Sequence, residues 1–185
     1  MGRVILGVLL AIVLAPVVLL GWLHYGNVPV AVADPLLPQE RLLTGLPLHA
    51  RIKRELVKTP PILVNEENLL AGAHLYKEQC AVCHGVHGKP SVIGGHIFPV
   101  APALWEKHND TVVGVSDDPP GETYWKVANG IRLTGMPAYK GILSENEIWQ
   151  VSLLLANANK PLPPSAVELL RGDAPSASAE TPEKK

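Results

Sequence analysis

The chain carries the sequence QCAVCHG at residues 79–85, and this stretch holds both cysteines of the 185 residues. Two thiols three positions apart at the end of a helix can reach the two vinyl groups on one edge of a porphyrin. The next residue, His84, is then carried beneath the ring, where an imidazole nitrogen meets the iron. Cys80 and Cys83 therefore predict one covalently bound haem c, for which Cys-x-x-Cys-His is the attachment sequence.

Three other uses of this cysteine pair remain as alternatives. A thioredoxin-like redox pair follows a strand in a βαβ unit, whereas the pattern here predicts a helix before the motif and a glycine-rich loop after it. A zinc site needs two further ligands, and the histidines that follow, His87, His96 and His108, fit no standard spacing. A structural disulfide leaves His84 without a role.

A haem that only passes electrons needs a second axial ligand, for which thioether and imidazole groups are the usual candidates. Apart from Met1, the chain has one methionine, Met136, which follows Gly135 and precedes Pro137. These neighbours let the backbone approach a flat ring and then hold it there. We therefore expect Met136 to bind the iron, with His96, His108 or a vacant position as the alternatives.

Helical patterns dominate the central part of the chain. One helix is predicted from the cap residue Asn65 to Cys80, and a shorter one over residues 121–128. Ser144 and Glu147 form a capping box for a third helix, and Leu143 and Ile148 are spaced as its hydrophobic staple. Between the first two helices, residues 85–120 read as one long loop, which in a small domain favours wrapping around a ligand. The fold class is all-α.

Residues 65–160 resemble the class I cytochrome c family. The resemblance rests on CAVCHG at residues 80–85 and on NGIRLTGMP at residues 129–137. It implies a fold of about three to five helices around one covalent haem. In this family the first and last helices cross, which implies contact of Gly72 and Tyr76 with Trp149. The resemblance also implies that the carbonyl group of Pro102 orients His84, through the Pro-x-Leu pattern at residues 102–104.

The N-terminal segment predicts a membrane anchor. No residue from Val4 to Leu23 is charged, and twenty such residues in a helix span about 30 Å, the thickness of the hydrocarbon core of a bilayer. Arg3 on one side indicates that the bulk of the chain lies outside the cytoplasm. We expect a single pass through the inner membrane, lipid contact by Val4–Leu23, and a periplasmic haem domain. Cleavage of a signal after Ala33 is the alternative.

The segments that flank the domain are rich in proline. Residues 1–25 form the anchor, and residues 26–64 form a tether. Five prolines within residues 34–64 predict that this tether has no long helices and that Leu46–Leu56 forms at most a short amphipathic turn or two. This tether is a solvated linker or a basic strip that binds lipid headgroups or an acidic partner. Residues 161–185 are predicted to form a disordered tail.

Charge and composition restrict the function. The net charge of −1 argues against binding to nucleic acid, and the sequence shows no recognisable catalytic triad or phosphate loop. We expect an electron-transfer protein rather than an enzyme, with no small-molecule substrate, that serves membrane-associated respiratory or photosynthetic complexes. The excess of acidic residues over residues 65–155 favours a redox partner with a basic docking surface. The alternatives are a subunit of a membrane dehydrogenase or terminal oxidase, and a haem sensor or peroxidase from which Met136 is displaced.

Overall fold

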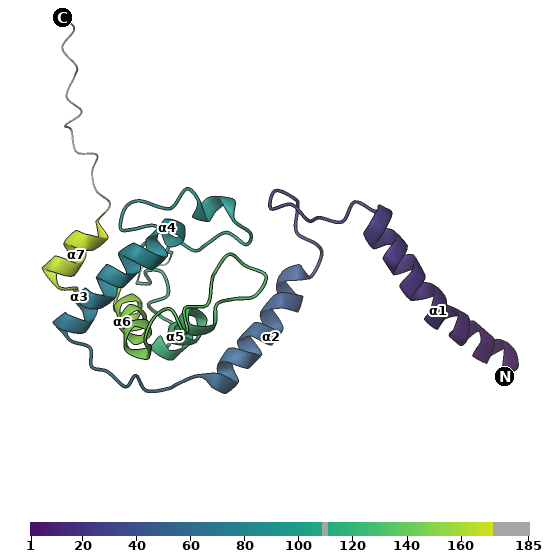
Figure 1. Ribbon diagram of the computed structural model, residues 1–185, viewed down its shortest axis with the longest axis horizontal. Coiled ribbons are helices and arrows are strands. Elements are labelled where there is room, and N and C mark those ends of the chain that lie inside the picture. Colours follow the sequence, from purple (N-terminus) through teal and green to yellow (C-terminus); the bar gives the residue numbers. More distant parts are fainter. Residues whose placement is uncertain (109–110, 172–185) are drawn as a thin grey trace, which may run out of the picture. The chain divides into compact units, whose positions relative to one another are not determined.

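The computed structural model describes residues 1–108 and 111–171. Within these residues the regular structure is helical, and there is no strand. The chain divides into two compact units, Met1–Leu42 and Leu43–Lys185. The helices are α1 (Gly2–Tyr25), α2 (Glu40–Glu55), α3 (Glu66–Leu75), α4 (Ala81–His84), α5 (Pro120–Asn129), α6 (Glu145–Ala156) and α7 (Pro164–Leu170), with a π-helical turn η1 (Tyr76–Cys80) and a 3₁₀ turn η2 (Gly94–His96) (Figure 1). The all-α prediction is confirmed.

Helix α1 is long and apolar enough to cross a membrane. Its 24 residues include Pro16 and are not buried by the rest of the chain. A signal sequence near an N-terminus has the same length and composition. The structure therefore supports an apolar helix at the predicted place.

The second unit, Leu43–Lys185, contains the cysteine motif and is named the haem-motif unit; the crossing of α3 and α6 forms its centre. A Cβ atom on Gly72 would lie 2.4 Å from the carbonyl oxygen of Gln150, so the two backbones touch at this glycine. Tyr76 is fully buried beside them, but its ring packs edge-on against Trp105, and Trp149 instead stacks on Tyr124. The predicted role of Gly72 is correct, whereas the predicted aromatic partner, Trp149, is wrong for this contact.

The predicted helix starts are present in the structure. The Asn65 side chain accepts a hydrogen bond from the backbone N–H of Asn68, which caps α3. At α6, Ser144 and Glu147 form both bonds of the capping box. These hydrogen bonds satisfy backbone N–H groups that have no partner within the helix. Because they join residues only three positions apart, short sequence patterns can predict where the helices begin.

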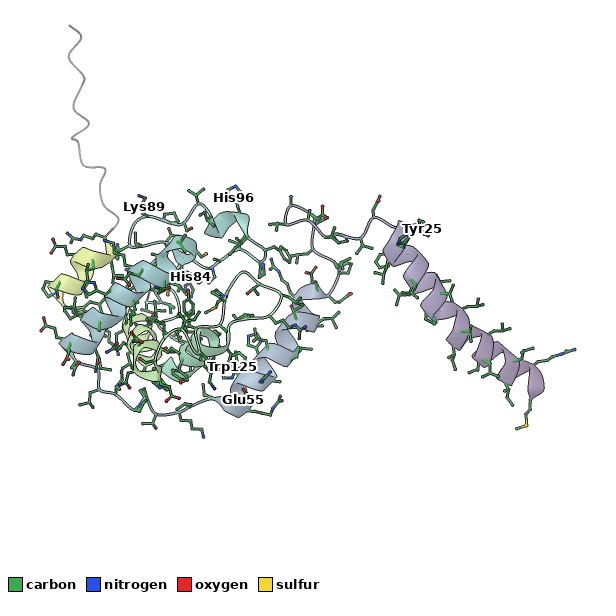
Figure 2. The ribbon with its side chains drawn as sticks, in the orientation of Figure 1. Tyr25, Glu55, His84, Lys89, His96 and Trp125 are labelled. Carbon is green, nitrogen blue, oxygen red and sulfur yellow. The ribbon has the colours of Figure 1, made fainter. Side chains whose placement is uncertain are left out.

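The expectation that prolines prevent a long helix in the tether is wrong. Helix α2 has 16 residues and contains Pro47. Ile52, on its inner side, is only 3% exposed, and the indole N–H of Trp125 on α5 donates to the Glu55 carboxylate at 2.8 Å. Figure 2 shows Glu55 and Trp125 side by side. Packing against α5 outweighs the helix-breaking tendency of one proline.

The expected disordered tail is also wrong for its first part. Helix α7 begins at Pro164, a favourable first position for proline. Ala166 and Leu170 are buried in the same core cluster as Leu69 and Leu154. Residues 172–185 lie outside the described residues, so the prediction of disorder there is not tested.

Candidate functional site

A π-helical turn presents the two cysteines. The chain leaves α3 through Tyr76–Cys80, with one extra residue per hydrogen-bonded ring, and continues into the single turn of α4, which ends at His84. Such π turns are common at functional sites because they rotate the following side chains relative to a regular helix. Both cysteines are free thiols, and burial together with the nearby Cys83 raises the pKa of Cys80 to about 12.

The end of α4 requires glycine. Gly85 has a φ of 71°, and a Cβ atom there would lie 2.7 Å from the carbonyl oxygen of Lys89. The buried Tyr76 hydroxyl donates to the Gly85 carbonyl at 2.7 Å, and burial raises the pKa of this phenol. The chain thus turns sharply after His84, and the turn is fixed to the helix that precedes the cysteines.

His84 is held by the backbone of the following loop. Its Nδ1 atom lies 2.8 Å from the carbonyl oxygen of Pro102. A carbonyl can only accept, so Nδ1 carries the proton and Nε2 keeps a free lone pair. Burial lowers the pKa of His84, and the bond to Pro102 opposes that effect. The ring is therefore oriented, and its burial favours the neutral form that a metal ligand requires.

A pocket of about 360 Å³ lies beside His84. It is lined by Cys83, His84, Pro90, Ser91, Gly95, Val100, Ala101, Pro102 and Ala103. The loop after the motif passes close to α4, since a Cβ atom on Gly94 would collide with the Cys83 carbonyl oxygen. The hydroxyl of Ser91 donates to the carbonyl of Val82 and accepts from the Gly94 N–H, so the loop is tied to α4.

Met136 lies in a loop that folds back on the end of α5. Gly130 ends α5 with a φ of 65°, and a Cβ atom there would lie 2.9 Å from the Met136 carbonyl oxygen. The Met136 N–H donates to the Thr134 hydroxyl at 3.0 Å, and its half-buried side chain packs with Val127 and Ile148. The structure thus places the predicted ligand in a braced turn.

Two contacts connect the Met136 loop to the cysteine motif and its loop. A Cβ atom on Gly135 would come within 3.1 Å of the Ile97 side chain. The Tyr139 hydroxyl donates to the carbonyl of Gln79, directly before Cys80, at 2.8 Å. Burial raises the pKa of Tyr139, and the neighbouring Cys80 and Cys83 add to this effect. Sequence reasoning missed Tyr139 as a positioning residue, because no local signal reveals a contact across 60 positions.

The alternative ligands lie at the surface. His87, His96 and His108 are exposed, and the Nδ1 atom of His96 lies 2.8 Å from the Val92 carbonyl oxygen. In Figure 2, His96 lies on the outer side of its loop and points away from His84. Within residues 1–108 and 111–171, no group of three or more His, Cys, Asp or Glu side chains is arranged to hold a metal ion.

The donor set fits a planar metal cofactor held by thioether bonds. It combines two cysteines that form no disulfide, an oriented imidazole and a half-buried thioether on a separate loop. In addition, the buried indole N–H of Trp105 has no acceptor among the described residues. Buried donors normally have partners, so this one is consistent with a polar group of a bound cofactor.

Comparison with known proteins points to the same region. The family described as cytochrome c oxidase, cbb3-type, subunit III matches residues 67–153. Over 129 residues, the chain is 28% identical to a thiosulfate dehydrogenase of Stutzerimonas stutzeri (strain A1501). This similarity covers 69% of the chain but only 39% of that relative, so the chain spans well under half of its length. The matched range of this chain includes the cysteine motif, Pro102 and Met136.

Proposed function

We propose that the chain is a c-type cytochrome, a membrane-anchored carrier of single electrons with one haem c; the family match over residues 67–153 supports this proposal. The observation that carries this proposal is the hydrogen bond from His84 to Pro102, directly after the cysteine pair. It leaves Nε2 free to bind iron, while Cys80 and Cys83 supply the two thioether bonds. A haem bound in this way supplies a one-electron Fe(III)/Fe(II) couple.

In this proposal His84 and Met136 would hold the iron of the haem. A thioether ligand would favour the reduced state and raise the potential relative to a second histidine. With both residues bound, the metal would offer no open place for a substrate. Pro102 fixes the imidazole ring and increases its basicity through the Nδ1 hydrogen bond. The chain's role is therefore to hold both ligands still while the charge on the iron changes.

The proposed location is the periplasmic side of the inner membrane, with α1 as the anchor. Haem is attached to such cysteine pairs outside the cytoplasm, and α1 has the length to reach across a bilayer. A signal cleaved after Ala33 is the competing arrangement. Mass spectrometry of the mature protein separates the two, since retention of Met1 or Gly2 supports the anchor.

Membrane-associated respiratory or photosynthetic complexes are the proposed partners. Residues 65–155 contain ten Asp and Glu against six Lys and Arg, which favours a basic docking surface on the partner. The rate of electron exchange with such a partner should fall as ionic strength rises.

Covalent attachment and redox behaviour test the proposal. We expect haem to remain on the wild-type chain in a denaturing gel, to be lost from a C80A/C83A variant, and to remain on a His96→Ala control. A potentiometric titration of the wild type should fit one electron. Loss of haem from the denatured wild type, or a titration that requires two electrons, would contradict the proposal.

A second candidate is a cytochrome subunit or module of a dehydrogenase, favoured by the similarity to the thiosulfate dehydrogenase. Mixing the oxidised protein with thiosulfate distinguishes the two functions. A carrier stays oxidised until a catalytic partner is added, whereas a dehydrogenase module that acts by itself becomes reduced. Copurification with a catalytic subunit would support the subunit role.

A further inference from the structure

Helix α2 has two chemically different sides. The inner side carries Ile52, which is 3% exposed, and Glu55, which accepts the hydrogen bond from Trp125 on α5. The Arg51 guanidinium lies 5.8 Å from the centre of the Trp125 ring, and its Nε atom lies 3.0 Å from the Glu55 carboxylate. These contacts attach α2 to the haem-motif unit along one face.

The outer face of α2 consists of Leu43, Leu46, Ala50, Lys53 and Arg54. These positions follow the helical repeat and lie on the side away from Ile52. Leu43 is 70% exposed and Leu46 is 61% exposed. Lys53 and Arg54 are exposed and form no salt bridge within the described residues. The face is thus apolar at its N-terminal end and basic at its C-terminal end.

This combination matches the surface of an anionic bilayer. Helices that lie on a membrane insert apolar side chains below the headgroups, and basic residues near an anionic surface are attracted to its phosphates. On α2, the leucines and the cations share the outer face. The chain also brings the helix close to a membrane, because only fourteen residues separate Tyr25 at the end of α1 from Glu40, of which Asp34 alone is charged.

We propose that the outer face of α2 binds the surface of a bilayer that contains anionic phospholipids. The proposal rests on the anchoring role of α1 given above. Since the opposite face of α2 is fixed to α5, lipid contact would also set the orientation of the haem domain against the membrane. The tether then acts as a docking helix that restricts which side of the domain meets a redox partner.

Photo-cross-linking of the full-length holoprotein in vesicles tests this surface. One variant carries p-benzoylphenylalanine in place of Leu46. The matched control carries it in place of Ile142, which is 68% exposed in the loop between α5 and α6. In vesicles of phosphatidylglycerol and phosphatidylcholine, we expect about tenfold more lipid adduct from position 46 than from position 142. Each basic residue near an anionic surface contributes about a factor of five in binding. A K53E/R54E variant should therefore fall to the control level, whereas K107E/K140E should not.

A second cross-linking position tests the membrane anchor separately from the outer face of α2. The same cross-linker in place of Leu14 in α1 reports insertion of the anchor in either lipid. Lipid adducts at position 14 but not at position 46 overturn the docking face alone, whereas the absence of adducts at position 14 rejects the anchor and with it the basis of this proposal. Equal adducts at position 46 in pure phosphatidylcholine, or adducts chiefly with a protein in native membranes, overturn the proposal.

Discussion

The Nδ1 atom of His84 lies 2.8 Å from the carbonyl oxygen of Pro102, although 18 positions separate the two residues in the chain. The loop between them is long and irregular, and its only regular turn is Gly94–His96. It nevertheless returns to the end of α4 and fixes the imidazole ring. This single bond orients the ring of His84, and it joins the two residues that the Pro-x-Leu pattern at residues 102–104 paired by resemblance.

Replacing Pro102 by alanine should raise the reduction potential. Without the proline ring, the loop holds its carbonyl less rigidly, and a weaker Nδ1 bond makes His84 a less basic ligand. A loss of about 0.5–1 kcal/mol in this bond corresponds to about 20–40 mV for one electron. Potentiometric titration measures the change. Pro90→Ala, in the wall of the same pocket, is the control and should shift the potential by less. An unchanged potential in Pro102→Ala would refute this role.

Tyr139→Phe should destabilise the contact between the Met136 loop and the cysteine motif. The change removes the hydroxyl that donates to the Gln79 carbonyl and leaves that acceptor without this partner. We expect a decrease of about 0.5–1.5 kcal/mol in the free energy of unfolding, measured by denaturant titration. Tyr124→Phe is the matched control, since the Tyr124 hydroxyl has no hydrogen bond within the described residues. Equal effects of both variants would show that the Tyr139 bond contributes nothing specific.

Gly72→Ala should disrupt the crossing of α3 and α6. The new Cβ atom would lie 2.4 Å from the Gln150 carbonyl oxygen, which belongs to the backbone and cannot rotate away. Overpacking of this kind costs about 1–3 kcal/mol in the free energy of unfolding. Gly95→Ala, where a Cβ atom meets nothing within 4 Å, should change it by less than about 0.5 kcal/mol. A fully stable Gly72→Ala protein would mean that the helices do not touch here.

The attachment of α2 to α5 should depend on pH through Glu55. The hydrogen bond from Trp125, followed by that from Arg51, lowers the pKa of this carboxyl. A lowered pKa in the folded state means that the contribution to stability is complete above the ordinary glutamate value, about 4.3, and is lost as the pH falls through the lowered value. In the reduced protein, the NMR signal of the Trp125 indole N–H should therefore titrate below about 4.3.

Glu55→Gln is the control for this titration. It should abolish the pH-dependent shift of the Trp125 signal, while the indole signals of Trp105 and Trp149 serve as internal references. A midpoint for Trp125 at or above the ordinary glutamate value would contradict the assigned hydrogen bond.

Local patterns predicted the parts of the fold that depend on neighbouring residues. The Asn65 cap and the Ser144–Glu147 capping box both join groups three positions apart, so their spacing in the sequence is their spacing in the structure. The Gly72 contact was predicted by resemblance and is present. By contrast, the expected partner Trp149 stacks on Tyr124. This was not predicted, because the spacing of aromatic residues in the sequence does not show which of them pack together.

Tertiary contacts explain why α2 and α7 form although the proline-rich sequence did not predict them. Pro47 and the surrounding prolines argue against α2, but burial of Ile52 and the Glu55–Trp125 bond stabilise the helix. The proline-rich start of the tail likewise folds as α7, because Ala166 and Leu170 find room in the core. Both helices are stabilised by contacts with residues on other helices, more than 60 positions away in the chain. Helical propensity describes only local sequence, so it does not predict these contacts.

The absorption spectrum of the oxidised holoprotein tests the central proposal most directly, through the weak far-red band given by methionine-bound ferric haem. We predict that the wild type has this band, that Met136→Ala abolishes it and lets the reduced protein bind carbon monoxide, and that His96→Ala keeps it. A c-type spectrum in which the far-red band is absent from the wild type, or survives in Met136→Ala, would contradict a closed His84–Met136 electron carrier.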